Sequence, residues 1–159
     1  MMKAKRILFL CTGNYYRSRF AELLFNHLAP QHELPWVASS RGLALELGSS
    51  NVGPIAIDTL KGLAARGVVL GREARFPLPL IEDDLASFDH IVALKRAEHL
   101  PLMARNFPRW VEHVEFWHVH DRDFALPEET LAHIEGNVIE LVARLRANVP
   151  ASSVARRRG

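Results

Sequence analysis

The sequence predicts a three-layer α/β/α protein built on a four-stranded parallel sheet. Short apolar stretches alternate with amphipathic helical stretches along the chain, which is typical of strands joined by right-handed helical crossovers. The first stretch, Ile7 to Leu10, is apolar without interruption, as expected for a central strand that helices cover on both faces. A length of 159 residues with 48% hydrophobic content suits one domain with a core of ordinary size.

The first half of the chain is expected to contain two strands and two helices, in the order strand, helix, strand, helix, at residues 5–10, 18–28, 35–40 and 54–66. Pro30 is expected to follow the end of the first helix, because proline disrupts helix interiors. Glycines and serines between residues 42 and 53 mark a long loop, after which Pro54 suits the first turn of the second helix. Gly67 then ends that helix.

The second half is expected to begin irregularly and then to add two strands and two longer helices. In chain order we expect irregular structure at 68–80, helical turns at 81–86, a strand at 88–94, a helix at 95–105, a strand at 111–117, a loop at 118–126 and a long helix from Pro127. We therefore expect a single domain over residues 1–149 and a basic, disordered tail over residues 150–159.

Charge and cysteine content argue against several functional classes. The net charge of +2 depends on Arg156, Arg157 and Arg158, since the other 17 basic and 18 acidic residues are nearly balanced. No basic stripe with interleaved aromatic residues indicates nucleic-acid binding, and no apolar run has the length of a membrane span or a signal peptide. A single cysteine allows no internal disulfide and suits a reducing compartment, so we expect a cytoplasmic protein.

The chemistry of the chain is expected between Cys11 and Ser18, where the first strand gives way to the first helix. A strand, a tight loop and a helix in this order point backbone N–H groups at an anion. The same N–H groups and the helix dipole favour the thiolate form of Cys11, which is the nucleophilic form. We therefore interpret the loop as a site where sulfur attacks phosphorus.

The other residues of this loop fit that interpretation. Arg17 provides a planar guanidinium that can bind two phosphate oxygens at once. Gly13 and Asn14 tolerate the left-handed backbone that a loop around an anion requires. Ser18 can donate its hydroxyl to the Cys11 sulfur. The candidate phosphate-binding residues are Thr12, Gly13, Asn14, Tyr15, Tyr16, Arg17 and Ser18.

The loop also carries a recognisable motif. Cys-x5-Arg-Ser follows the first strand directly, with Gly13-Asn14 inside the motif and Ala21-Glu22 after it. In these features the chain resembles the low-molecular-weight protein tyrosine phosphatases. The resemblance implies their phosphatase I-like fold with strand order 2-1-3-4. It also implies hydrolysis of phosphotyrosine proteins or small aryl phosphates through a cysteinyl-phosphate on Cys11, without cofactor or metal. Phosphate, sulfate and vanadate are then expected as inhibitors, and the protein as a monomer or weak dimer.

The resemblance further implies a general acid and a supporting serine. The family places an aspartate that protonates the leaving oxygen in an Asp-Pro-aromatic loop after the fourth strand. Asp121 lies at this position and is the expected catalytic acid. However, Arg122 replaces the proline and Asp123 the aromatic residue, so Asp123 remains an alternative acid. Ser39 corresponds to a family serine that hydrogen-bonds the loop asparagine, which predicts a bond between Asn14 and Ser39.

Three side chains in or near the motif need separate comment, because one departs from the family and each has two possible roles. Tyr16 stands where many members have a second cysteine, so a disulfide that protects the nucleophile is not expected. Tyr15 and Tyr16 either line the mouth of the cleft and stack on a substrate ring or pack beneath it. Arg75 either has a structural role or adds positive potential near the site.

Three other functions remain open. The altered acid loop is compatible with a non-catalytic domain that binds phosphate or phosphopeptides. Thiol-dependent arsenate reductases resemble this family in their loop, but they relay oxidation through further cysteines, which a partner thiol such as glutathione would have to replace here. A metal enzyme built on His118 and His120 with Asp121 or Asp123 is the third alternative, although no further ligands occur at a recognisable spacing.

Overall fold

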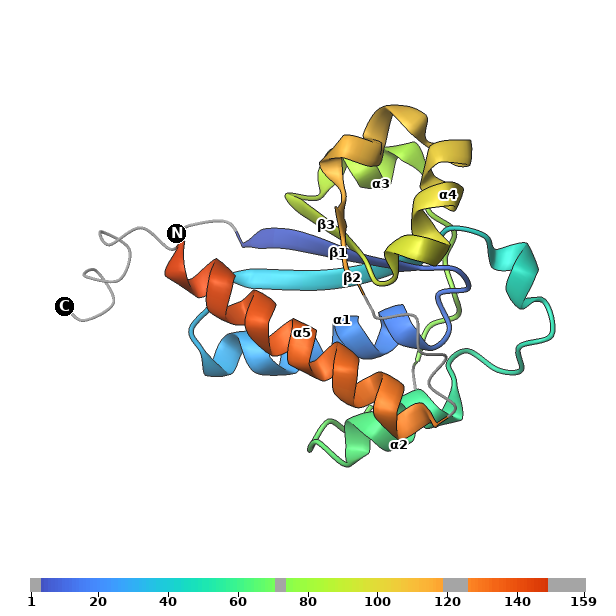
Figure 1. Cartoon of the computed structure of the whole chain (residues 1–159). Helices are drawn as coiled ribbons and strands as arrows, with labels where there is room; N and C mark the ends of the chain where they lie inside the picture. The colour runs from blue at the N-terminus through green and yellow to red at the C-terminus, as the bar shows by residue number, and fades with distance from the viewer. Residues whose placement is uncertain (1–3, 71–73, 119–125, 149–159) are drawn as a thin grey trace.

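The computed structural model of the chain describes residues 4–70, 74–118 and 126–148. Its strands form one parallel sheet in the predicted order, β2-β1-β3-β4 (Figure 1). The strands are β1 (Lys5–Cys11), β2 (Trp36–Gly42), β3 (His90–Ala93) and β4 (Glu115–Phe116). The central position of β1 explains its uninterrupted apolar sequence, since Ile7 to Leu10 are fully buried.

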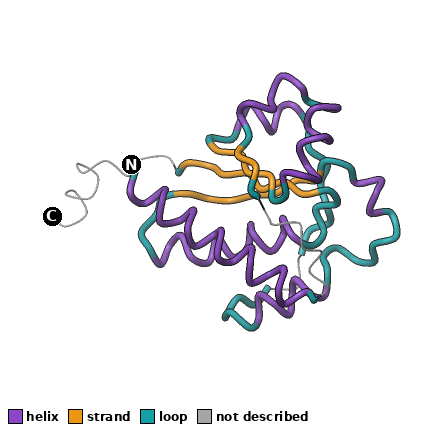
Figure 2. Tube along the Cα trace, viewed as in Figure 1, coloured by secondary structure: helices purple, strands orange, loops and turns teal. Residues whose placement is uncertain are grey.

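Helices cover both faces of the sheet and form the two outer layers, as predicted (Figures 1 and 2). One face is covered by α1 (Arg17–Gln31), α2 (Ile57–Ala64) and α5 (Pro127–Ala147), and the other by α3 (Glu82–Ser87) and α4 (Arg96–Asn106). Successive side chains of β1 enter different cores, because strand side chains alternate between faces. Ile7 and Phe9 belong to the first core, on the side of α1 and α5, and Leu8 and Leu10 to the second core, on the side of α3 and α4.

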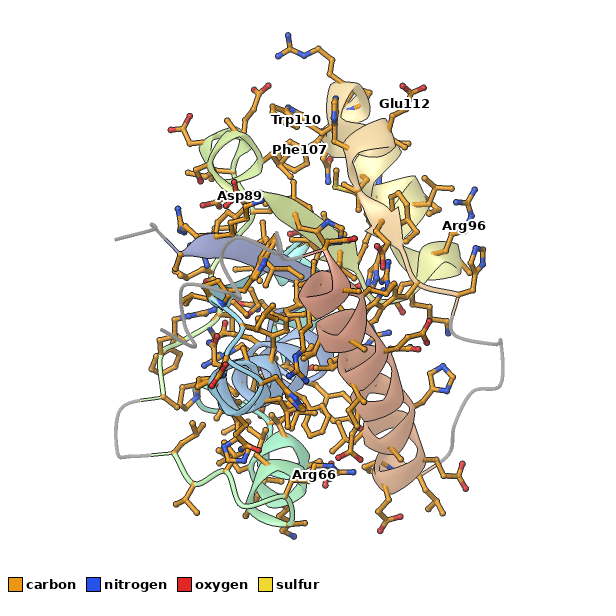
Figure 3. All side chains as sticks on the ribbon, turned by 90° about the vertical axis from the view of Figure 1, so that its left-hand side faces the viewer. Arg66, Asp89, Arg96, Phe107, Trp110 and Glu112 are labelled. Atoms are coloured by element: carbon orange, nitrogen blue, oxygen red, sulfur yellow. The ribbon has the colours of Figure 1, made fainter. Side chains whose placement is uncertain are left out.

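Side-chain contacts join neighbouring elements within each layer. Figure 3 shows Arg66 beside α5, where its Nε lies 3.0 Å from Glu135 Oε2. On the opposite side of the sheet, Phe107 and Trp110 pack against the second core around the short 3₁₀ helix η2 (Pro108–His113).

Two helix boundaries differ from the prediction. α1 continues through Pro30 to Gln31. A proline in the last turn deprives only one carbonyl, that of Asn26, of its intrahelical partner, so the helix tolerates it there. α2 begins at Ile57 and not at Pro54, so Pro54 belongs to the preceding loop.

The predicted fourth strand, residues 111–117, is helical in its first three residues and much shorter than expected. Residues 111–113 belong to η2, whose first residue Pro108 suits the first turn of a helix, and β4 contains only two residues. A second 3₁₀ helix, η1 (Leu45–Gly48), lies within the loop predicted after β2. Both differences arise in short segments where apolar spacing does not separate a strand from a tight helix.

The carboxyl ends of β1 and β2 are held together at one edge of the sheet. The N–H of Leu43 donates to Cys11 O at 2.9 Å, and that of Ala44 to Thr12 O at 3.0 Å. Gly42 permits this approach, because a Cβ at that position would lie 2.9 Å from Thr12 O. Parallel sheets bind ligands at this edge, so the fold places the segment after Cys11 at the expected position for a site.

Candidate active site

The 11–18 loop (Cys11 to Ser18) forms one wall of a cleft of about 210 Å³ at this edge of the sheet. The cleft is lined by Cys11, Thr12, Gly13, Tyr15, Tyr16, Arg17, Leu47, Gly48 and Asn51. Of the candidate phosphate-binding residues, only Asn14 and Ser18 do not line the cleft, and both are fully buried behind it. The structure therefore brings the predicted loop residues together around one hollow.

The backbone N–H groups of the loop are available to a ligand. Within the described part of the chain, those of Gly13, Asn14, Tyr15 and Tyr16 donate to no protein acceptor. Because α1 begins at Arg17, the N–H groups of its first turn have no intrahelical partner either. N–H groups that converge on a concave surface at a helix N-terminus are a binding site for an anion.

Asn14 holds the loop in shape from behind. Its backbone has a φ of 50°, the left-handed conformation predicted for this position. Its Nδ2 donates to Ser18 Oγ at 2.9 Å and to Ser40 Oγ at 2.8 Å. Its Oδ1 accepts from Arg75 Nη1 at 2.9 Å and from the N–H of Leu78 at 3.0 Å. Four bonds to one buried amide fix the loop to β2 and to the segment after residue 73.

The supporting serine is Ser40 and not Ser39, so the predicted bond between Asn14 and Ser39 is wrong. Neighbouring strand residues point to opposite faces, and it is Ser40 that is fully buried on the side of Asn14. Ser39 instead accepts from Arg41 Nη1 at 2.8 Å. Ser40 also donates to Glu22 Oε1 at 2.7 Å.

Arg75 has a structural role, which is one of the two roles predicted for it. Besides Asn14, it binds Ser40 O at 2.9 Å and Glu22 Oε1 at 3.1 Å through Nη2. These contacts lie behind the 11–18 loop, on the side away from the cleft. The guanidinium therefore joins three polar groups of the loop support and is neutralised in part by Glu22.

The sulfur of Cys11 lies at the bottom of the cleft, with only 3% of the residue exposed. Cys11 Sγ is 2.8 Å from Ser18 Oγ. Ser18 Oγ already accepts from Asn14 Nδ2, which leaves the Ser18 hydroxyl hydrogen for the sulfur. A donor placed in this way favours a negatively charged sulfur over a neutral thiol. The predicted Ser18–Cys11 contact is thus present.

The guanidinium of Arg17 lies at the cleft and is bound to a carboxylate from the opposite layer. Arg17 Nη2 donates to Oε2 of Glu98, a residue of the first turn of α4. The hydroxyl of Thr12 donates to the same oxygen at 2.8 Å. One carboxylate oxygen therefore receives donors from both ends of the 11–18 loop.

His99 lies behind Glu98 and is fully buried. Its Nδ1 accepts from the N–H of Lys95 at 3.0 Å, so in the neutral ring Nε2 carries the proton. Nε2 lies 2.8 Å from Glu98 Oε2, although its N–H is not well aligned for a hydrogen bond. Burial lowers the pKa of His99, which favours the neutral ring.

Glu98 is ionised at neutral pH. The contact with His99, the charge of Arg17 and the Thr12 hydroxyl hold the pKa of Glu98 well below its usual range, against the opposing effect of partial burial. An ionised carboxylate has no proton to donate to a leaving group. Glu98 is therefore unsuited to be the general acid.

The two loop tyrosines take different positions. Tyr15 lies at the mouth of the cleft, where its hydroxyl donates to Val52 O at 2.6 Å. Tyr16 packs partly against the first core, and burial followed by the charge of Asp58 raises its pKa. Both rings, together with Thr130, also line a neighbouring hollow of about 360 Å³. Both tyrosines therefore line the cleft, and Tyr16 also packs against the core, whereas stacking on a substrate ring stays a prediction.

The candidate acids lie outside the described residues. Asp121, Asp123 and His120 are in the segment 119–125, so the acid assignment stays a prediction. In the part of the chain that is described, no three His, Cys, Asp or Glu side chains are grouped to hold a metal ion. Of the described helices, none combines the length and the apolar character needed to cross a bilayer.

Sequence reasoning did not assign Glu98, His99 or Ser40 to the site. Glu98 is 81 positions from Arg17, and the helical pattern around it gave no reason to connect the two. A usable signal was present, because Glu98 and His99 lie in the first turn after β3, at the strand end where parallel sheets bind ligands.

With the fold and the site described, comparison with known proteins identifies the family. A model of the family described as low molecular weight phosphotyrosine protein phosphatase matches residues 6–151. The chain therefore belongs to this family of phosphatases. Among curated proteins, a search finds no significant match.

Solved structures of this fold include proteins with different activities. The low molecular weight protein tyrosine phosphatase of T. tengcongensis is 21% identical with a TM-score of 0.72, covering 89% of this chain and 99% of its own. YwlE of Bacillus subtilis, an arginine phosphatase solved with a phosphorylated active-site serine, is 22% identical with a TM-score of 0.73, at 90% and 97% coverage. A thioredoxin-dependent arsenate reductase of Corynebacterium glutamicum is 23% identical with a TM-score of 0.66, at 92% and 64% coverage. These similarities support the fold and leave the substrate open.

Proposed function

We propose that the protein is a metal-independent phosphatase that hydrolyses phosphotyrosine and other aryl phosphate monoesters through a cysteinyl-phosphate intermediate. The observation on which this rests is the position of Cys11 Sγ at the bottom of the cleft, 2.8 Å from the Ser18 hydroxyl and at the base of a loop whose N–H groups donate to no acceptor among the described residues. Membership of a phosphatase family supports the same reaction.

The chemistry has two steps. The Cys11 thiolate attacks phosphorus in line, a sulfur–phosphorus bond forms, and the bond from phosphorus to the phenolic oxygen breaks. Arg17 and the loop N–H groups stabilise the charge on the equatorial oxygens. Water then attacks phosphorus, the sulfur–phosphorus bond breaks, and phosphate leaves with the thiolate restored.

The leaving oxygen needs a proton from a carboxylic acid. Glu98 is excluded from this role because it stays ionised, which supports an acid from the segment after β4. We assign the role to Asp121, which gives its proton to the phenolate and afterwards takes one from the attacking water. Asp123 is the alternative acid.

Hydrolysis of p-nitrophenyl phosphate tests the function. We expect that a chelator does not change the turnover of the wild type. For Asp121→Ala we expect a rate about 10²–10⁴-fold lower. The Asp123→Ala variant is the matched control and should keep most of its activity. A loss confined to Asp123→Ala would transfer the role to that residue, and a loss on chelation would contradict the metal-free reaction.

The same assay separates the two alternative functions. A protein that binds phosphate or vanadate without any turnover would be a phosphate-binding domain. Arsenate reduction requires an electron donor, and Cys11 is the only cysteine, so it would have to depend on an added thiol. Turnover of p-nitrophenyl phosphate without an added thiol would support the phosphatase over both alternatives.

The remaining properties follow from the family resemblance. Phosphate, sulfate and vanadate should inhibit by occupying the loop, and inhibition by phosphate should be competitive with substrate. The cytoplasmic location and the monomeric or weakly dimeric state stay predictions, which fractionation and sedimentation measurements can check.

A further inference from the structure

Glu98 is an unexpected residue for an anion-binding cleft, because its negative charge opposes that of a phosphate. It lies in the first turn of α4, on the opposite layer from α1 but at the same edge of the sheet (Figure 1). Its carboxylate has several partners, although 38% of its side chain is exposed. Arg17, Thr12 and His99 all contact its Oε2.

The contact with Glu98 leaves Arg17 able to bind an oxyanion. A guanidinium has five N–H donors, and Glu98 contacts only Nη2. Because Nη2 carries two hydrogens, it can donate one to Glu98 and the other, together with Nε, to a phosphate oxygen pair. Glu98 therefore orients the guanidinium without using up its donors.

Thr12 connects the other end of the loop to the same oxygen. Its hydroxyl donates to Glu98 at 2.8 Å, while its carbonyl accepts from Ala44. The 11–18 loop is thus fixed from two sides, by the buried amide of Asn14 behind it and by Glu98 across the cleft.

The ring of His99 lies directly behind the carboxylate of Glu98. The ring is fully buried, and the N–H of Lys95 fixes its Nδ1 at 3.0 Å. The protonated Nε2 therefore faces the carboxylate at 2.8 Å. A rigid ring behind a charged side chain reduces the entropy that the side chain would lose in holding Arg17.

We infer that Glu98, supported by His99, is a positioning residue that holds Arg17 and Thr12 in the geometry for binding the phosphoryl group. This inference rests on the proposed phosphatase function. Among the described residues, the carboxylate of Glu98 contacts Arg17, Thr12 and His99 and not the Cys11 sulfur. It acts by keeping two groups of the loop in place before the anion arrives, so that binding requires less reorganisation.

The opposite possibility is that Glu98 competes with phosphate for Arg17. The two cases predict changes of opposite sign when the carboxylate is removed. If Glu98 positions Arg17, Glu98→Ala weakens phosphate binding. If it competes, the same substitution makes phosphate bind more tightly.

The experiment measures the dissociation constant of inorganic phosphate for the full chain by titration calorimetry, and kcat and KM for p-nitrophenyl phosphate. For Glu98→Ala we expect phosphate binding about 10-fold weaker, as for one lost charged hydrogen bond, and kcat about 10–10²-fold lower. Glu98→Gln should recover part of both losses, because its amide oxygen can still accept from Arg17 and Thr12. Glu82→Ala is the matched control, since Glu82 binds Arg109 and Trp110 at an exposed site and should leave both constants unchanged.

His99 is tested separately with His99→Leu, which fills the buried space with an apolar side chain. We expect a smaller change in the same direction as for Glu98→Ala, with a thermal unfolding curve that shows one cooperative transition. Unchanged constants for His99→Leu would overturn the supporting role. Phosphate binding that is unchanged or tighter in Glu98→Ala would overturn the positioning role itself.

These outcomes are distinguishable from failure of the proposed function, because phosphate binding needs no turnover. Weaker phosphate binding in Glu98→Ala together with no hydrolysis by the wild type would reject the phosphatase and keep the positioning role. Wild-type hydrolysis with both constants unchanged in Glu98→Ala would reject the positioning role alone.

Discussion

Two carboxylates in this protein have nearly the same chemical surroundings and different consequences. Glu98 is contacted by an arginine, a histidine and a hydroxyl. Glu115 is contacted by Arg144, His90 and the indole N–H of Trp117, at 2.7, 3.2 and 2.6 Å. The pKa of each carboxyl is held well below its usual range, with the histidine contact as the largest cause.

The difference lies in what the donors belong to. Those of Glu98 include the two ends of the 11–18 loop, so its geometry affects the proposed phosphate site. The donors to Glu115 come from α5, from β3 and from the residue after β4, so that carboxylate joins the sheet to a helix. A depressed pKa therefore does not by itself indicate a functional site. Whether such a carboxylate affects a site depends on where its donors lie in the fold.

The largest expected effect contrasts the two arginines. Arg17→Lys should lower kcat/KM for p-nitrophenyl phosphate by about 10²–10³, because lysine cannot bind two phosphate oxygens in the planar arrangement of a guanidinium. Arg144→Lys should leave kcat/KM within about twofold of the wild type, since its partner Glu115 is outside the cleft. Equal losses of kcat/KM in the two variants would contradict a specific role of Arg17 in the site.

The next expected effect is on the stability of the fold and concerns Glu115. Glu115→Ala removes the acceptor of the indole of Trp117, a buried residue, together with the partner of His90. We expect a loss of about 1–3 kcal/mol and a Tm lower by several degrees, with kcat unchanged. Thermal unfolding and steady-state assays of the same preparation check both parts. A Tm equal to that of the wild type would contradict the structural role.

The smallest expected effect is on the pH dependence of stability. A carboxyl whose pKa is lower in the folded protein stabilises the fold above its unfolded value of about 4.3, and this contribution is lost as the pH falls towards the folded value. Because the pKa of Glu115 is lowered, wild-type stability should decrease as the pH is reduced below about 5. Glu115→Gln should flatten this decrease. Denaturant unfolding at several pH values checks it, and an unchanged slope would argue against the ionised cluster.

The sequence predicts the parts of the site that are continuous along the chain. Cys11, Asn14, Arg17 and Ser18 lie within eight residues, and the strand–loop–helix order is sufficient to place Cys11 and Arg17 at one cleft with Asn14 and Ser18 buried behind it. The strand order followed from resemblance, because no periodicity shows which strands are neighbours.

The sequence fails where the arrangement depends on strand phase or on distant contacts. Ser39 and Ser40 differ only in which face of β2 they occupy, and their burial could not be read from neighbouring residues. Glu98 reaches Arg17 only because α4 starts at the end of β3, beside β1 in the sheet. Pro30 within α1 shows, in addition, that a proline in the last turn does not end a helix, because it removes only one intrahelical hydrogen bond.

The most direct test of the proposed chemistry is to quench wild-type protein during turnover of p-nitrophenyl phosphate and to measure the mass of the intact chain. The account predicts a phosphoryl group bound to Cys11 that disappears as substrate is exhausted, and no turnover by Cys11→Ser, which should still bind phosphate. Continued hydrolysis by Cys11→Ser, or wild-type turnover through an enzyme that never acquires a phosphoryl group, would contradict it.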